Sequence, residues 1–218
     1  MSDRVGIMGG TFDPIHHGHL VAAEEAHRQL ALDLVLFVPA GRPWQKPEGV
    51  TSAEDRYLMT AIATAANPAF AVSRLEVDAP GPTYTVDTLR RLRAELGEGT
   101  RLFFIVGADA ILHLSTWKEL QAVLEMTEFV AAARPGADLD GLHEVLGRVP
   151  AAAGRIHRID IPELAISSTD IRDRVARGAA FQYLVPEGVA RYIAKRGLYY
   201  ARGGQGSPGC MPPPGSVP

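Results

Sequence analysis

The sequence predicts an α/β fold, a doubly wound parallel sheet in a single domain. Apolar runs rich in β-branched and aromatic residues recur along the chain with helical patterns between them, which is typical of parallel strands joined by crossover helices. The chain of 218 residues is 46% hydrophobic and 22% charged, which is enough apolar material for one sizeable core. We therefore expect one domain over residues 1–200.

The expected strands are the apolar runs Val5–Met8, Leu34–Pro39, Phe70–Val72, Leu102–Val106, Phe129–Ala132 and Arg155–Ile159. Apolar residues at three- and four-residue steps predict crossover helices over residues 19–32 and 53–66, and Ser52 is placed to cap the second.

Two more helices and a tail complete the predicted order. The first covers Thr85–Leu96 and should end in a left-handed cap at Gly97. The second follows Pro186 and should end at Gly197. Residues 201–218 are rich in Gly, Pro and Ser, so we expect a disordered tail there.

Composition argues against several classes of protein. A formal net charge of −3 gives no electrostatic footprint for nucleic acid, so no nucleic-acid partner is expected. The chain contains no apolar run of membrane-spanning length and no secretory signal pattern, which favours a cytoplasmic protein without a membrane partner. Cys210, the single cysteine, excludes an intramolecular disulfide. The oligomeric state stays open, with a homo-oligomer as one alternative.

The stretch GGTFDPIHHGHL, residues 9–20, occupies the first strand-to-helix connection, where open α/β sheets commonly bind phosphate. Gly9 and Gly10 leave the backbone N–H groups accessible to an anion, and Thr11 and Phe12 continue the same loop. The spacing matches neither the dinucleotide-binding fingerprint nor the P-loop. If the loop binds phosphate, we expect it to do so in another way.

Two histidines follow at a helix start. His16 and His19 are expected on one face of the first turn, and Gly18 between them lets a ligand approach the backbone. Both rings could donate hydrogen bonds to phosphate oxygens, and a bound polyphosphate would favour their protonated forms. The alternatives are an ordinary glycine turn and a zinc site.

A second motif, ISSTDIR, reads as another helix N-terminus. Ser167 or Ser168 caps it, Thr169 adds a hydroxyl, and the guanidinium of Arg172 can reach the same anion. The alternative is ordinary helix capping beside a solvated arginine.

Other candidate ligand contacts lie between these two motifs. Asp109 follows the expected strand end at Gly107 and could accept hydrogen bonds from ribose hydroxyls or cap a loop. Trp117 offers a flat face for a heteroaromatic ring, although many tryptophans belong to the core. Tyr84 and Thr85 begin a helix whose free N–H groups could bind a carboxylate.

These motifs resemble those of bacterial nicotinate mononucleotide adenylyltransferases, in the H-x-G-H nucleotidyltransferase superfamily, over roughly residues 4–200. The resemblance implies a Rossmann-like nucleotidyltransferase fold and the reaction of ATP with nicotinate mononucleotide to give deamido-NAD and pyrophosphate, with Mg²⁺ accompanying ATP. It assigns catalysis to His16, His19 and Arg172. It assigns ATP binding to Gly9, Gly10, Thr11, Phe12, Gly18, Gly107, Asp109, Ser167, Ser168 and Thr169.

For the mononucleotide, the resemblance implies contacts from Lys46, Tyr84, Thr85, Trp117 and Arg134. The chain departs from the family where members often carry a histidine that helps to hold the acceptor phosphate, because Gln45 stands there. Lys46 could supply the charge, and the Gln45 amide could still donate. The alternatives are transfer to another acceptor, nicotinamide mononucleotide or phosphopantetheine, and a non-catalytic nucleotide-binding regulator.

Overall fold

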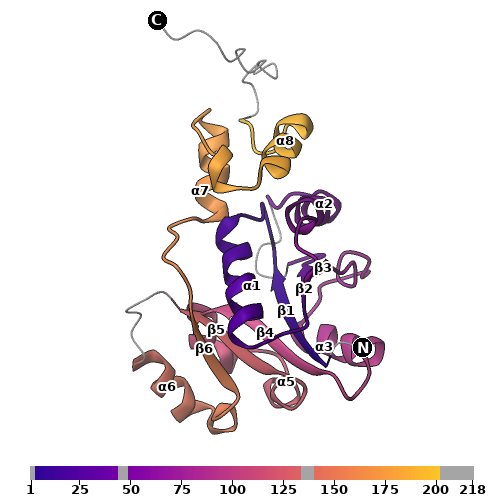
Figure 1. Ribbon diagram of the computed structural model, residues 1–218, viewed down its shortest axis with the longest axis vertical. Helices are drawn as coiled ribbons and strands as arrows, with labels where there is room; N and C mark the ends of the chain where they lie inside the picture. Colours follow the sequence, from indigo (N-terminus) through magenta and orange to yellow (C-terminus); the bar gives the residue numbers. More distant parts are fainter. Residues whose placement is uncertain (1–2, 44–48, 134–139, 202–218) are drawn as a thin grey trace, which may run out of the picture.

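The computed structural model describes residues 3–43, 49–133 and 140–201 (Figure 1). Its centre is a six-stranded sheet in the order β3-β2-β1-β4-β5-β6, in which all neighbouring strands are parallel. The fold class and all six predicted strands are confirmed. The strands are β1 (Arg4–Gly10), β2 (Leu34–Pro39), β3 (Phe70–Val72), β4 (Arg101–Gly107), β5 (Glu128–Ala133) and β6 (Ile156–Asp160).

Helices cover both faces of the sheet and bury one apolar cluster on each. One cluster takes side chains from α1 (His17–Gln29), α2 (Ala53–Thr64), α7 (Ser168–Ala176) and α8 (Glu187–Arg196). The other takes them from α3 (Thr85–Leu96), α4 (Ala108–Leu112), α5 (Leu120–Met126) and α6 (Asp140–Arg148). Successive strand residues point to opposite faces, so Phe103 and Phe104 belong to different clusters.

The helix predictions succeed where a helix is long. Helix α1 begins at His17, two residues before the predicted start. Ser52 caps α2, since its side chain accepts a hydrogen bond from the Asp55 N–H at 3.0 Å. Gly197 ends α8 in the left-handed conformation as expected. Helix α3 ends at Gly97 as predicted, and this glycine has a positive φ of 90°. Its ψ of 154° lies outside the left-handed helical region, so the cap is not of the predicted left-handed type.

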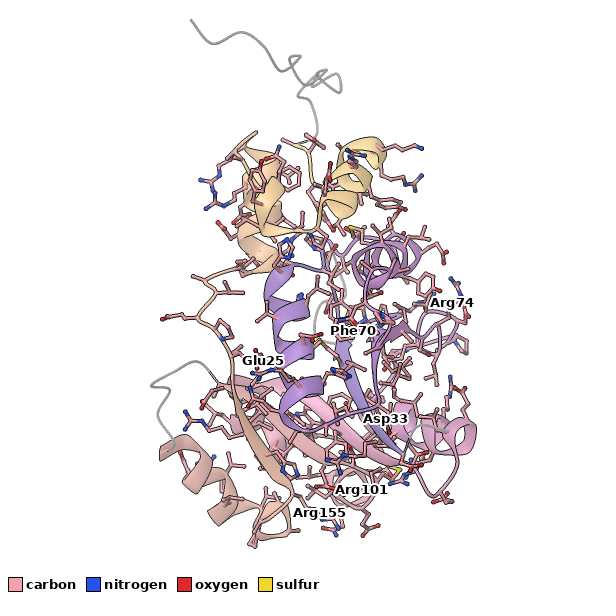
Figure 2. All side chains as sticks on the ribbon, in the orientation of Figure 1. Glu25, Asp33, Phe70, Arg74, Arg101 and Arg155 are labelled. Atoms are coloured by element: carbon pink, nitrogen blue, oxygen red, sulfur yellow. The ribbon has the colours of Figure 1, made fainter. Side chains whose placement is uncertain are left out.

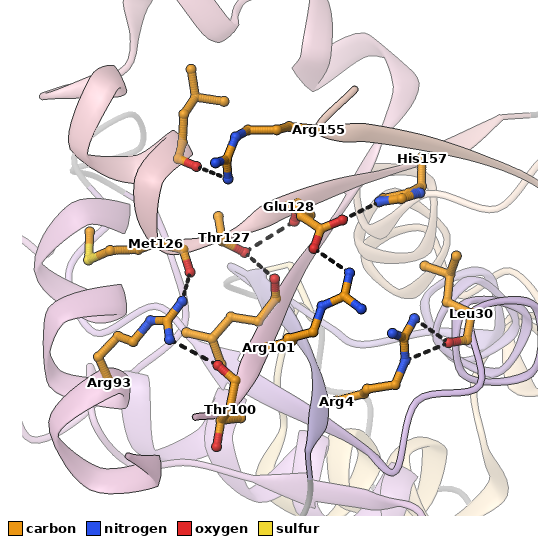
Figure 3. Close-up of polar contacts among 12 residues, drawn as sticks. Arg4, Leu30, Arg93, Thr100, Arg101, Met126, Thr127, Glu128, Arg155 and His157 are labelled. Atoms are coloured by element: carbon orange, nitrogen blue, oxygen red, sulfur yellow. Dashed lines mark hydrogen bonds and ion pairs between the residues drawn. The ribbon is translucent and has the colours of Figure 1, made fainter. Parts of the chain in front are cut away.

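The amino ends of the strands carry a structural role. Figure 3 shows arginines there that donate to carbonyl oxygens near helix C-termini, which an α-helix leaves without internal partners. Arg4 binds the Leu30 carbonyl at 2.8 Å, and Arg155 binds that of Leu124 at 2.7 Å. Arg101 pairs with Glu128 at 2.8 Å. Figure 2 places Arg101 and Arg155 at the lower end of the molecule, far from α7 and α8.

A ligand is expected at the carboxyl ends of the strands, opposite the arginines. The order in which successive strands join the sheet reverses between β1 and β4, and the crevice outside the carboxyl ends of these two parallel strands is the usual binding place. Figure 1 shows α7 and α8 at this end, above the start of α1. The tail predicted at 201–218 lies, apart from Ala201, outside the described residues. Among the described residues, no helix is long and apolar enough to cross a membrane.

Candidate active site

The two glycines at the end of β1 are required by packing as well as by any ligand. A Cβ on Gly9 would lie 3.1 Å from the Phe104 ring, and one on Gly10 would lie 2.8 Å from the Phe12 ring. Phe12 itself has a positive φ of 50°. The backbone at Gly9 and Gly10 is therefore free of side chains, as the sequence predicts. A side chain at either position would crowd a neighbouring aromatic ring.

His16 and His19 come together as predicted, although His16 precedes the helix and caps it in an extended conformation. Their rings stack with centroids 3.7 Å apart and an interplanar angle of 24°. The backbone N–H of His16 donates to Nδ1 of His19 at 3.3 Å. A neutral His19 that accepts at Nδ1 carries its proton on Nε2, which is then a donor.

Burial keeps both rings neutral in the free chain. It lowers the pKa of His16 to about 4, with a smaller contribution from His17, and the pKa of His19 to about 3, with a smaller contribution from His16. The predicted protonation of these two histidines therefore applies only when an anion such as a polyphosphate is bound beside them. His16 is only 7% exposed, and its side chain faces the backbone N–H of His19 in a reciprocal capping box at the start of α1.

The zinc alternative receives no support. Two stacked imidazoles cannot aim their nitrogens at one tetrahedral ion. Within the described ranges, no group of three or more His, Cys, Asp and Glu could hold a metal.

A cavity of about 590 Å³ opens at the carboxyl ends of β1, β4 and β5. Its walls are mainly apolar, with the two imidazoles as the main polar groups. A Cβ on Gly18 would lie 3.0 Å from Nδ1 of His16, so this glycine leaves the ring its space. The lining residues are Met8, Gly9, His16, Gly18, His19, Val21, Ala22, Ile105, Val106, Gly107, Ala110, Ala132, Ile161, Pro162, Leu164 and Ile166.

The second motif packs directly on the loop of the first. Ser167 caps α7 by accepting from the Asp170 N–H at 3.1 Å, whereas Ser168 donates its hydroxyl to the Pro14 carbonyl at 2.9 Å. Arg172 donates through Nη1 to the Asp13 carbonyl at 2.7 Å and through Nη2 to the Thr169 hydroxyl at 3.2 Å. The two motifs, more than 150 residues apart in sequence, therefore form one structure.

Sequence reasoning missed Arg56, which is 1% exposed. Its guanidinium donates to three backbone carbonyls on three separate segments: Thr11 at 2.7 Å, Gly41 at 2.8 Å and Thr51 at 2.9 Å. Burial lowers its pKa, and the nearby Asp13 opposes that shift. On a helix this arginine looks like any surface residue, so the pattern carries no signal for it.

The predicted mononucleotide contacts lie elsewhere. Tyr84 caps α3 and Thr85 is its first residue, as expected. The Trp117 ring contacts Phe104 and Phe129 edge to face, with centroids 5.7 and 5.5 Å away, so it is partly a core residue. Neither Tyr84, Thr85 nor Trp117 lines the cavity beside the histidines. Tyr84 and Trp117 pack with the cluster on the other face of the sheet.

Several predicted contacts fall outside what the structure describes. Lys46, Gln45 and Arg134 lie outside the described residues. Asp109 lies in the first turn of α4, and only its backbone is described. Gly107 ends β4 and lines the cavity as predicted.

The chain is similar to known proteins over most of its length. A family model described as cytidylyltransferase-like matches residues 7–174. A probable nicotinate-nucleotide adenylyltransferase from Acidothermus cellulolyticus is 54% identical over 201 residues, covering 90% of this chain and 94% of the relative. One from Leifsonia xyli is 55% identical over 196 residues, with the same coverage of both chains.

The fold likeness extends to a solved structure. The nicotinic acid mononucleotide adenylyltransferase of Plasmodium falciparum, complexed with NaAD, superposes with a TM-score of 0.73 at 21% identity, covering 90% of this chain and 97% of that one. The sequence likeness, the cavity at the strand reversal and the joined motifs agree, and the chain belongs to the nicotinate-nucleotide adenylyltransferase family within the cytidylyltransferase-like proteins.

Proposed function

We propose that this chain transfers the adenylyl group of ATP to nicotinate mononucleotide and that His16, His19 and Arg172 stabilise the charge that develops during transfer. The observation that carries the assignment is the pair of imidazoles, His16 and His19, that line one cavity at the carboxyl ends of β1, β4 and β5. A few polar groups placed at one end of a mainly apolar cavity are typical of a site that orients a polar ligand group.

The donor nucleotide fits the cavity beside the histidines. Its apolar wall of Ile105, Ala132 and Ile161 suits a purine ring, and its polar end at His16 and His19 suits the phosphates. In this proposal Gly9, Gly10, Thr11 and Phe12 line the phosphates together with Gly18, Ser167, Ser168 and Thr169, while Gly107 and Asp109 lie near the ribose.

The acceptor fits the other face of the same strand ends. Phe104 touches the Gly9 position on one side and Trp117 on the other, so the two predicted half-sites meet at the end of β1. The Lys118 ammonium lies 4.3 Å from the centre of the Tyr84 ring and also pairs with Asp87 at 3.8 Å. We assign acceptor binding to Tyr84, Thr85 and Trp117, with Lys46 and Arg134 as further proposed contacts.

The chemistry is an in-line displacement at the α-phosphorus of ATP. An oxygen of the acceptor 5′-phosphate forms the new P–O bond, the bond to the β-phosphate oxygen breaks, and pyrophosphate leaves with its electron pair. No protein nucleophile is needed. The protein holds the two phosphates in line and stabilises the added negative charge with donors from His16, His19 and Arg172.

Mg²⁺ as the partner of ATP remains part of this proposal. Since the described residues offer no cluster of metal-binding side chains, the nucleotide phosphates and water would supply most of its ligands. Magnesium bound in this way neutralises phosphate charge. The cytoplasmic location and self-association raised by the sequence remain predictions.

The test is product formation from ATP and nicotinate mononucleotide by the purified chain. His19→Ala should lower kcat by roughly 10²–10³, because it removes one preorganised donor to developing negative charge, with a smaller effect on ATP binding. His113→Gln, at an exposed histidine, is the matched control and should leave kcat unchanged. Equal kcat for His19→Ala and the unmodified chain would refute the catalytic assignment.

The acceptor is tested by replacing nicotinate mononucleotide with its amide. N–H groups at the start of α3 would pair with a carboxylate but would face the NH₂ of the amide as a second donor. Each mispaired donor costs about 1–3 kcal/mol, so we expect roughly 10²–10⁴ discrimination in kcat/KM for the acid. Equal values would remove Thr85 from the site and favour a different acceptor.

A further inference from the structure

We propose that Tyr199 is a positioning residue for the loop of residues 9–13 and that it acts through the side chain of Asp13. The Tyr199 hydroxyl donates to Oδ1 of Asp13 at 2.7 Å, and the Thr51 N–H donates to Oδ2 at 3.2 Å. The Asp13 carbonyl accepts from Arg172 at 2.7 Å. The inference rests on the proposed assignment of this loop and Arg172 to the phosphates of ATP.

Asp13 needs these partners because it is buried. Its exposed fraction is 4%, and a buried carboxyl group without hydrogen-bond donors would be costly. Burial and the neighbouring Asp13 raise the pKa of Tyr199, so the phenol keeps its proton and acts as the donor. The C-terminal segment that follows α8 is thereby bonded to the first loop across 186 positions of sequence.

The backbone on both sides of this hydrogen bond adopts a conformation that is uncommon for residues other than glycine. Phe12, next to Asp13, has φ 50°, and Tyr199 has φ 69°. Such conformations persist where surrounding contacts determine them. The bond joins the two unusual segments, so its loss should allow the loop to relax from the shape in which Arg172 docks.

Helix α8, which precedes Tyr199 in the chain, offers a control. The Tyr192 hydroxyl also donates to a carboxylate, Oδ1 of Asp55, at the same distance of 2.7 Å. That bond joins α8 to α2, because Asp55 is an α2 residue rather than a member of the loop. Tyr192→Phe and Tyr199→Phe therefore each remove one tyrosine–carboxylate hydrogen bond, but only Tyr199 is bonded to the proposed phosphate site. Asp55 also keeps donors from Ser52 and Arg196, so Tyr192→Phe is the milder change.

The first experiment compares steady-state kinetics of the two variants. We expect Tyr199→Phe to lower kcat/KM for ATP roughly tenfold, since small misplacement of a positioning group is costly, while KM for nicotinate mononucleotide stays within about twofold. Tyr192→Phe should change neither value by more than about twofold. Equal kinetics in the two variants, or a Tyr199→Phe protein that does not fold, would overturn the proposal.

The second experiment measures ATP affinity by calorimetry without an acceptor. The dissociation constant should rise roughly tenfold in Tyr199→Phe and stay within about twofold in Tyr192→Phe. Unchanged affinity in Tyr199→Phe would also overturn the inference. This measurement does not depend on the acceptor, so it separates the failure of the inference from the failure of the proposed reaction, which would appear as absent product with the unmodified chain.

Discussion

Replacement of Arg56 by methionine tests how much the architecture beneath the site depends on one buried side chain. Methionine keeps an unbranched apolar stem but removes every donor. The change leaves three backbone carbonyls, those of Thr11, Gly41 and Thr51, without their present partner. The first of these carbonyls lies in the loop after β1, and the other two lie near the two ends of the connection between β2 and α2.

The magnitude follows from the three hydrogen bonds. A bond to a charged group contributes about 1.5–3 kcal/mol, and removing one partner of a buried charged network costs about 3–5 kcal/mol. Relief of the buried charge, which already lowers the Arg56 pKa, offsets part of the sum. We therefore expect a loss of roughly 3–5 kcal/mol, which for a chain of this size corresponds to roughly 10 °C in melting temperature.

The assay is urea and thermal unfolding of the variant beside two others. Arg56→Lys keeps the charge but cannot reach all three carbonyls, so it should lose roughly half as much. Arg191→Met breaks an exposed pair with Glu187, both side chains 78% exposed, and should cost at most about 0.5 kcal/mol. A loss below about 1 kcal/mol in Arg56→Met would refute the role assigned to the buried guanidinium.

Three further predictions concern the site. In the unfolded chain, histidines take up a proton near pH 6.5, whereas folded His16 and His19 do so only near pH 4 and 3. The free energy of unfolding should therefore fall as the pH is lowered from 6.5 to 5, by up to about 1.4 kcal/mol per pH unit per ring. The raised pKa of Glu76 has the opposite effect on stability, but this effect is present in both proteins when His16→Asn is compared with the unmodified chain. In urea unfolding, the free energy of unfolding of His16→Asn should depend less steeply on pH. An equal pH dependence in the two proteins would contradict the pKa assignment. Trp117→Phe should raise KM for acid and amide mononucleotides alike, and a selective effect on one would show that this ring also discriminates. Gly18→Ala should displace the His16 ring, 3.0 Å from the new Cβ, and lower kcat about tenfold or more with a smaller change in melting temperature; unchanged kcat would place that ring outside the reaction.

The strands and the longer helices follow from local pattern, but the short helices do not. Apolar β-rich runs located every strand, because a strand buried on both faces needs only a few consecutive apolar residues. Helix α4 has 5 residues and α5 has 7, too few turns to establish a helical period. Their positions depend on tertiary packing against the sheet.

The candidate site divides in the same way. His16 and His19 are three residues apart at a helix start, so their contact could be predicted from their spacing alone. The bond from Tyr199 to Asp13 joins residues 186 positions apart, and no local pattern indicates it. The burial of Arg56 is likewise a tertiary fact. Trp117 illustrates the converse, since an aromatic residue predicted as a ligand contact also packs on the core.

The polar contacts beneath the loop explain how bare backbone can serve as an anion site. The carbonyl of Gly10 accepts from the Ala40 N–H at 2.9 Å, and the carbonyl of Thr11 accepts from Arg56 at 2.7 Å. In a trans peptide the N–H points opposite to the C=O, so these contacts turn the N–H groups of Thr11 and Phe12 away from the β2 and α2 side. The same two contacts keep the carbonyl oxygens of Gly10 and Thr11 pointing away from a bound phosphate.

The two arginines that bind this loop therefore differ in kind. Arg56 donates from each of its three guanidinium nitrogens to a backbone carbonyl and is buried, so its loss should appear first as lower stability. Arg172 is only partly buried, and its contact with the Thr169 hydroxyl, at 3.2 Å, is weaker than its contact with Asp13. An anion that competes for that second nitrogen would meet little resistance. Arg172 is thus suited to exchange a protein contact for a phosphate contact during the reaction, whereas Arg56 is suited to keep the loop in place while this happens.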